Sequence, residues 1–83
     1  MVVGGWKPAV SVHAGRHGGR NYVITDAAKA ADVLLHDWPD NAPRGRKHLK
    51  ARKVLLRCLE GKCDPGQARQ AFVEAAEEAN ILA

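Results

Sequence analysis

Two short segments near the start of the chain alternate between apolar and polar residues, and a glycine-rich stretch separates them. Alternation with a period of two in "PAVSVHA" and "RNYVIT" is typical of β-strands, and "GRHGG" between them can adopt the positive φ angles of a tight turn. The pattern predicts a β-hairpin over about residues 8–25. One side would be apolar and face a core, with Val23 on the opposite side; this apolar side consists of Val10, Val12, Ala14, Tyr22 and Ile24.

A hairpin of two strands is marginally stable in water, so this one needs a second layer on its apolar side. Three later stretches have apolar residues at helical spacing, and they predict helices over about residues 26–38, 44–60 and 64–80. The chain is therefore expected to form an α+β domain of ββααα order, with the hairpin and the helices in two layers.

Stop and start signals separate the three expected helices. Thr25 or Asp26 can cap the first helix, and Pro39 ends it because a residue that precedes proline avoids the α conformation. Gly61 fits the position just after the second helix. The third begins at "DPGQ", where Asp64 can cap the helix, proline occupies its first turn and the glutamine can complete a capping box.

The spacing also predicts which side of each helix is buried. The first helix would bury Ala27, Ala30, Ala31, Leu34, Leu35 and Trp38. The second would bury Ala51, Val54, Leu55, Cys58 and Leu59, on a face widened by Leu49 and Leu56. The third would bury Ala68, Ala71, Phe72, Ala75, Ala76 and Ala79, after which Ile81 and Leu82 are expected to fold back onto the core.

Length and composition set the broad class. With 83 residues, of which 46% are hydrophobic and 27% charged, the chain is expected to form one globular domain over residues 1–83. It has no apolar run of membrane-spanning length, so no membrane partner is expected. It also lacks the apolar core of an export signal, which predicts a cytoplasmic protein.

The strongest functional signal is the charge of residues 44–62. This stretch carries eight of the thirteen Lys and Arg but one acid, Glu60, in a chain whose formal net charge is +4. On a helix at 100° per residue, one narrow stripe of about 16 Å would be basic. The candidate surface for an anion or an acidic partner consists of Arg46, Lys47, Lys50, Lys53 and Arg57.

Two interpretations of this basic stripe remain open. An amphipathic helix needs a polar face, and Lys and Arg are good helix formers. However, solvated faces usually mix both signs of charge, and like charges at i,i+4 repel each other. A single-sign stripe therefore favours an anionic partner: nucleic acid, an acidic protein, or the acidic residues Glu74, Glu77 and Glu78 of the third helix, in the same chain or in a second copy.

Signals for catalysis, metal binding and cofactors are weak. The histidines do not form a zinc-binding motif, so no metal and no cofactor is expected. His48 projects toward the apolar side of its helix and is expected to be partly buried and hydrogen-bonded. Cys58 and Cys63 are spaced awkwardly for a disulfide, and two free thiols are expected, with Cys58 buried and unreactive.

Several segments, in their order and spacing, resemble a small bacterial family called domain of unknown function 982. They are "WKPAVSV", "ITDAAKAADVLLHDWP", "HLKA", "CLEG" and "ARQAFVEAAEEANI", and together they extend from Trp6 to Ile81. The best markers are the pair Trp38-Pro39 and the alanine-rich stretch from Ala68 to Ala79. The resemblance implies a ββααα domain of this size. It implies no activity, cofactor or catalytic residue.

The sequence therefore favours a small binding or regulatory module without catalytic activity, which acts through protein–protein contacts. Its partner would be an acidic protein or a second copy of the chain, because a hairpin leaves open strand edges that a homodimer can pair. The alternative is nonspecific nucleic-acid binding through the basic stripe. An enzyme has less support, since it would need a pocket that brings His48 or Cys63 together with an Arg or Asp.

Overall fold

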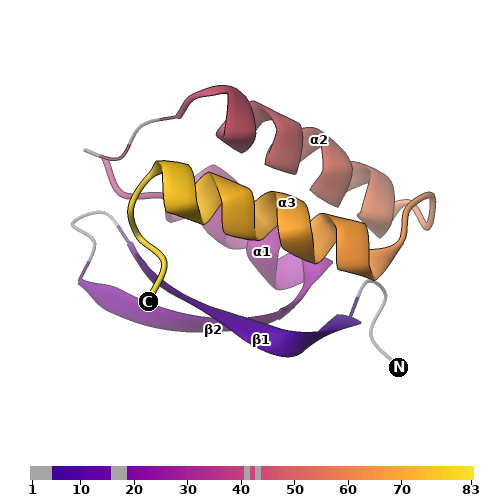
Figure 1. The fold of residues 1–83 in the computed structure, drawn as a ribbon, viewed down its shortest axis with the longest axis horizontal. Helices are drawn as coiled ribbons and strands as arrows, with labels where there is room; N and C mark the ends of the chain where they lie inside the picture. Colours follow the sequence, from indigo (N-terminus) through magenta and orange to yellow (C-terminus); the bar gives the residue numbers. More distant parts are fainter. Residues whose placement is uncertain (1–4, 16–18, 41, 43) are drawn as a thin grey trace.

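The order of elements in the computed structural model is β1 (Gly5–Ala14), β2 (Arg20–Asp26), α1 (Ala27–His36), α2 (Arg46–Leu59) and α3 (Pro65–Glu78). The structure describes residues 5–15, 19–40, 42 and 44–83. It is an α+β arrangement of ββααα order, as predicted, with an antiparallel hairpin followed by three helices (Figure 1).

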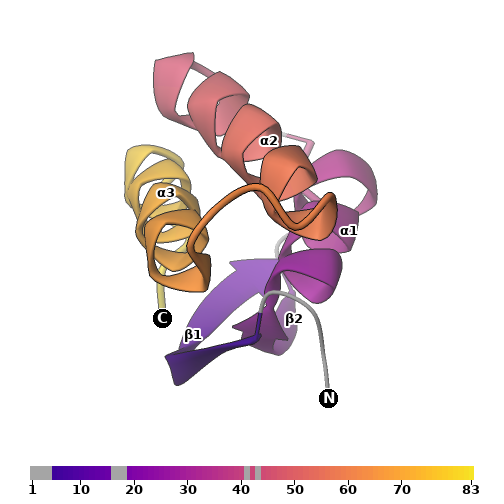
Figure 2. The same ribbon diagram turned by 90° about the vertical axis from the view of Figure 1, so that its right-hand side faces the viewer.

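All three helices lie on one side of the hairpin. Figure 2 shows α1 and α3 next to the strands, and α2 on the far side of these two helices. Phe72 of α3 is fully buried at the centre, where its ring lies 6.4 Å from that of Trp6 in β1 and 6.3 Å from that of Trp38. Consequently, α2 packs on other helices along one side and presents its opposite side to solvent.

The hairpin has the alternation that its sequence predicts. Val10 is paired with Ile24 and Val12 with Tyr22, and all but the half-buried Tyr22 are buried against the helices. Val23, on the opposite side, is 64% exposed. The centre of the predicted turn, residues 16–18, lies outside the described residues.

The outer edge of β1 is occupied by the last residues of the chain. The His13 amide donates to the Ile81 carbonyl at 2.7 Å, and the Ala83 amide donates to the Ser11 carbonyl at 2.9 Å. Ile81 is buried as predicted, but the prediction for Leu82 is wrong, because its side chain is 41% exposed. A residue in a strand alternates sides with its neighbours, so Leu82 turns outward where Ile81 turns inward.

Helix α1 begins as predicted and ends two residues earlier than predicted. The Asp26 carboxylate accepts from the Lys29 amide at 2.7 Å and caps the first turn. The helix ends at His36, and Trp38, which directly precedes proline, is buried outside it. Leu35 is 44% exposed, which contradicts its predicted place on the buried side.

The buried side of α2 is narrower than predicted. It consists of His48, Ala51, Leu55 and Cys58, with Val54 half-buried. Leu49 and Leu56 are 44% and 45% exposed, and Leu59 is 38% exposed, so none of these leucines belongs to the core. Since α2 is the outermost helix, its neighbours cover one side of it and do not reach the leucines.

The glycine, the aspartate cap and the proline predicted around the α2–α3 turn are confirmed. Gly61 has a φ of 77°, in the left-handed region that favours glycine. The Asp64 carboxylate accepts from the Gly66 amide at 2.9 Å, and Pro65 occupies the first turn of α3. The predicted alanine stripe is buried, and its small side chains allow α3 to lie close to its neighbours.

Candidate functional site

The basic residues of α2 lie mainly on its outward side, away from α1 and α3. They are exposed, and in the part of the chain that the structure describes no salt bridge involves Arg46, Lys53 or Arg57. Lys50 lies nearer to α3, where its charge helps to lower the pKa of the Glu74 carboxyl. The outermost helix therefore presents a row of cations that the described acidic side chains leave largely uncompensated.

Lys47 differs from the other four candidates because it is paired within the fold. Its Nζ lies 3.1 Å from Oε1 of Glu74, on the facing side of α3. The hydrogen bond from Lys47 and a second one from Gln70 lower the pKa of Glu74. The predicted pairing of the basic stripe with acidic residues of the third helix thus occurs at Lys47. Among the described residues, the other four candidates form no salt bridge; of these, Lys50 lies toward α3, and Arg46, Lys53 and Arg57 lie on the outward side.

Glu78 caps the first turn of α2, a role that the sequence pattern did not predict. The cap position of α2 is Gly45, which has no side chain to accept hydrogen bonds from the first turn. Glu78 supplies the acceptor from α3: its carboxylate oxygens lie 3.2 Å from the Gly45 amide nitrogen and 3.5 Å from that of Lys47. The Glu78 carboxylate therefore caps the start of α2, and among the described residues it forms no salt bridge with the outward cations.

Exposed leucines accompany these cations. Leu49 lies next to Lys53 on the helix surface, and Leu56 follows two turns later on the same side. A shallow hollow is lined by Arg46, Leu49, Lys50, Lys53, Val54 and Arg57. We call the combined surface the α2 outer face; it comprises Arg46, Leu49, Lys50, Lys53, Leu56 and Arg57. It offers positive charge and aliphatic contact area together.

His48 has a structural environment. It is 6% exposed, its Nε2 lies 3.2 Å from the Leu34 carbonyl oxygen, and its ring packs against the edge of Trp38. Burial lowers the pKa of His48, and the hydrogen bond to Leu34 opposes this effect in part. The predicted burial and hydrogen bonding are confirmed, and a neutral imidazole links α2 to α1.

The two cysteines are free thiols, as predicted. Cys58 is buried, and burial followed by contact with the Cys63 thiol raises its pKa to about 11. At neutral pH it therefore remains protonated and is a poor nucleophile. Cys63 is half-buried, and its Sγ lies 3.6 Å from the carbonyl oxygens of Val54 and Asp64. The Cys63 thiol thus contacts the carbonyls of Val54 and Asp64, whereas the His48 ring contacts the carbonyl of Leu34. These contacts do not pair the Cys63 thiol with His48.

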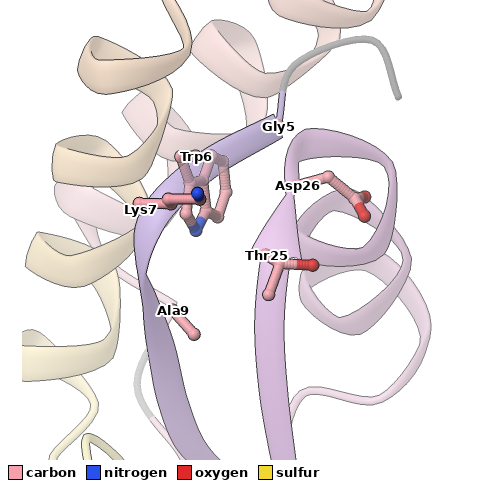
Figure 3. Close-up of a pocket in the computed structure, with 6 residues that line it drawn as sticks. All are labelled: Gly5, Trp6, Lys7, Ala9, Thr25 and Asp26. Carbon is pink, nitrogen blue, oxygen red and sulfur yellow. The ribbon is translucent and has the colours of Figure 1, made fainter. Parts of the chain in front are cut away.

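A second hollow, of about 630 Å³, opens between the strands of the hairpin (Figure 3). It forms because β1 has four residues between the paired positions Gly5 and Val10, where β2 has one, Thr25. Two of the polar side chains at this hollow are engaged in the fold: Trp6 donates from Nε1 to the Ile24 carbonyl, and Asp26 caps α1. The hydrogen bond of Trp6 thus links the irregular part of β1 to β2.

Two further properties concern metals and membranes. Within residues 5–15, 19–40, 42 and 44–83, no three His, Cys, Asp or Glu side chains gather closely enough to hold a metal ion. Among the described helices, none combines the length and the apolar character that crossing a bilayer requires.

Fold and surface together define a small ββααα domain with an exposed cationic helix. The family model described as "Protein of unknown function (DUF982)" matches residues 9–83, and the chain belongs to this family. The resemblance seen in the sequence is thereby confirmed. No curated protein and no solved structure gives a significant match to the chain.

Proposed function

We propose that the chain is a small cytoplasmic binding module without catalytic activity, and that its α2 outer face binds an acidic segment of a partner protein. The supporting observation concerns the α2 outer face: it combines two exposed leucines, Leu49 and Leu56, with cations that have no salt-bridge partner among the described residues. Cations attract an acidic chain from a distance, and leucines provide the apolar contact that holds it.

The leucines favour a protein partner over nucleic acid. Phosphate binding requires cations that follow the backbone, and recognition of single strands adds aromatic rings on which bases stack. The α2 outer face contains no aromatic residue, and the buried Trp38 and Phe72 are not available for stacking. Exposed aliphatic side chains beside the cations are instead suited to an acidic helix with an apolar side.

The first test is fluorescence anisotropy with a labelled acidic peptide that forms an amphipathic, leucine-containing helix. The double variant Lys50→Glu/Lys53→Glu should weaken binding at least tenfold, because it reverses charge at the centre of the α2 outer face. Lys7→Glu/Lys62→Glu is the matched control, since it makes the same change in net charge outside this face and should bind as the unmodified chain does.

A second variant separates protein binding from nucleic-acid binding. Leu49→Ala/Leu56→Ala should weaken the peptide complex at least tenfold, because burial of a leucine side chain contributes about 1.5–3 kcal/mol. The same variant should leave affinity for a short DNA duplex unchanged. If the chain instead bound DNA, with affinity falling roughly a hundredfold between about 50 and 200 mM salt and no effect of the leucines, the α2 outer face would be a phosphate-binding surface.

A further inference from the structure

The two edges of the hairpin differ. The β1 edge is occupied, because the chain end pairs with Ser11 and His13, and the Arg69 side chain donates to the Pro8 carbonyl at 2.8 Å. The His13 amide points toward the chain end, so its partner across the hairpin, Asn21, directs its own amide and carbonyl away from β1. By the same alternation, Val23 and Thr25 also direct their backbone groups outward.

These outward groups form a free strand edge. In the described part of the chain, no backbone group is hydrogen-bonded to the outward amides and carbonyls of Asn21, Val23 and Thr25. Val23, at the middle of the strand, is 64% exposed, the largest value among the exposed large hydrophobic side chains of the described residues. An unpaired edge with a β-branched apolar residue at its centre favours pairing with another strand.

The sequence of β2 is complementary to itself in one register. Its seven residues, "RNYVITD", run from Arg20 to Asp26 and are centred on Val23. When two copies pair antiparallel about Val23, Asn21 of one copy lies opposite Thr25 of the other. Because both residues have outward backbone groups, these positions and the central valine form hydrogen-bonded pairs, and every outward amide and carbonyl finds a partner.

Charge selects the same register. Antiparallel pairing about Val23 places Arg20 of each copy opposite Asp26 of the other, whereas parallel pairing would bring like charges together. Asp26 accepts from the Lys29 amide through Oδ1, so its second carboxylate oxygen can accept from the arginine. Tyr22 would lie opposite Ile24 on the helix side of the joined sheet, and two valines would meet on the other side.

We propose that the β2 edge binds a second copy of this chain in this register, which gives a twofold-symmetric dimer with one four-stranded sheet. The order would be β1–β2–β2–β1, with the chain end of each copy covering each outer edge. The contacts of the chain end with Ser11 and His13, and of Arg69 with Pro8, restrict the addition of a third copy at the outer edges of such a dimer. This surface is distinct from the α2 outer face, and the inference does not depend on the proposed function.

The test is sedimentation velocity in reducing buffer over a wide range of chain concentration, since a single strand pair is a small interface and the dimer is expected to form at micromolar concentration. The variant Val23→Pro removes the central amide, which the monomer does not use, and an edge strand tolerates such a proline. It should remain a monomer at all concentrations, with an unchanged far-ultraviolet circular dichroism spectrum.

A second variant keeps the test decisive if the proline disturbs the strand. Arg20→Glu changes an exposed residue and places acids opposite each other at both ends of the interface, so the dimer should dissociate at least tenfold more readily. In the unmodified chain, hydrogen exchange at Asn21, Val23 and Thr25 should slow as concentration rises. A monomer at millimolar concentration, or a dimer that both variants leave intact, would overturn the proposal.

Discussion

At the scale of single residues, His48 shows how a polar side chain in a helix interface becomes a pH-dependent contribution to stability. Its imidazole extends from α2, is buried against the Trp38 ring, and is hydrogen-bonded to the Leu34 carbonyl of α1. Burial, together with the charges of Arg44 and Arg52, lowers its pKa below the ordinary value of 6.5, against the opposing effects of Leu34 and Glu78. The folded chain therefore prefers the neutral form.

The sign of the pH dependence follows from this direction. Below pH 6.5 the unfolded chain binds a proton at His48 more readily than the folded chain does, so stability is complete above 6.5 and falls as the pH decreases toward the lowered value. We expect the free energy of unfolding in urea to decrease between about pH 7 and 5, and the decrease to be smaller in His48→Gln. An equal decrease in both proteins would contradict this assignment.

At the scale of elements, α2 depends on α3 for its first turn. Gly45 provides no capping side chain, and the Glu78 carboxylate occupies the space that a side chain there would need: a Cβ atom at Gly45 would lie 2.9 Å from both of its oxygens. The end of one helix and the start of another are thus joined by a carboxylate. This contact helps to fix the angle at which α2 lies on α3.

We expect Glu78→Ala to lower the free energy of unfolding by about 1 kcal/mol, the usual loss for a helix cap. Glu77→Ala is the matched control, because Glu77 is an exposed neighbour of the same charge, and its change should stay within about 0.5 kcal/mol. Urea unfolding of the two variants measures the difference. Equal effects would mean that Glu78 acts through general charge and not as a cap.

At the scale of the whole molecule, Phe72 connects the layers, because its ring lies near Trp6 of the hairpin and near Trp38 beyond α1. Phe72→Ala should lower the free energy of unfolding by about 3–5 kcal/mol, a large part of the roughly 4–12 kcal/mol expected for a domain of this length. Tryptophan fluorescence during urea unfolding would report the loss. A decrease below about 1 kcal/mol would show that Phe72 is not central.

Local patterns predicted the local structure well. The period-two alternation placed Val12 and Ile24 inside and Val23 outside, and Asp26, Gly61 and Asp64 marked helix ends, because strand faces and caps depend on neighbours in sequence. Among candidate site residues, the outward direction of most cations followed from helical geometry. These features needed no knowledge of how the helices pack.

Predictions that depended on packing were less accurate. Leu49 and Leu56 seemed to widen the buried face of their helix, but the number of neighbours around a helix is set by the tertiary fold, and α2 is covered on one side. The Lys47–Glu74 ion pair and the capping of α2 by Glu78 both join α2 to α3. They depend on how these two helices pack, which the sequence pattern does not predict. The difference between the two hairpin edges likewise depends on distant residues.

The covered edge of β1 has a consequence for the order of folding. Arg69 meets Pro8 across 61 positions, and the contacts of Ile81 and Ala83 with β1 span still more of the chain. Contacts between such distant positions close large loops and are expected to form late on the pathway, whereas the hairpin and the α2–α3 pair are local. Until they form, the outer edge of β1 is unpaired, and an unpaired edge favours aggregation of the chain during refolding.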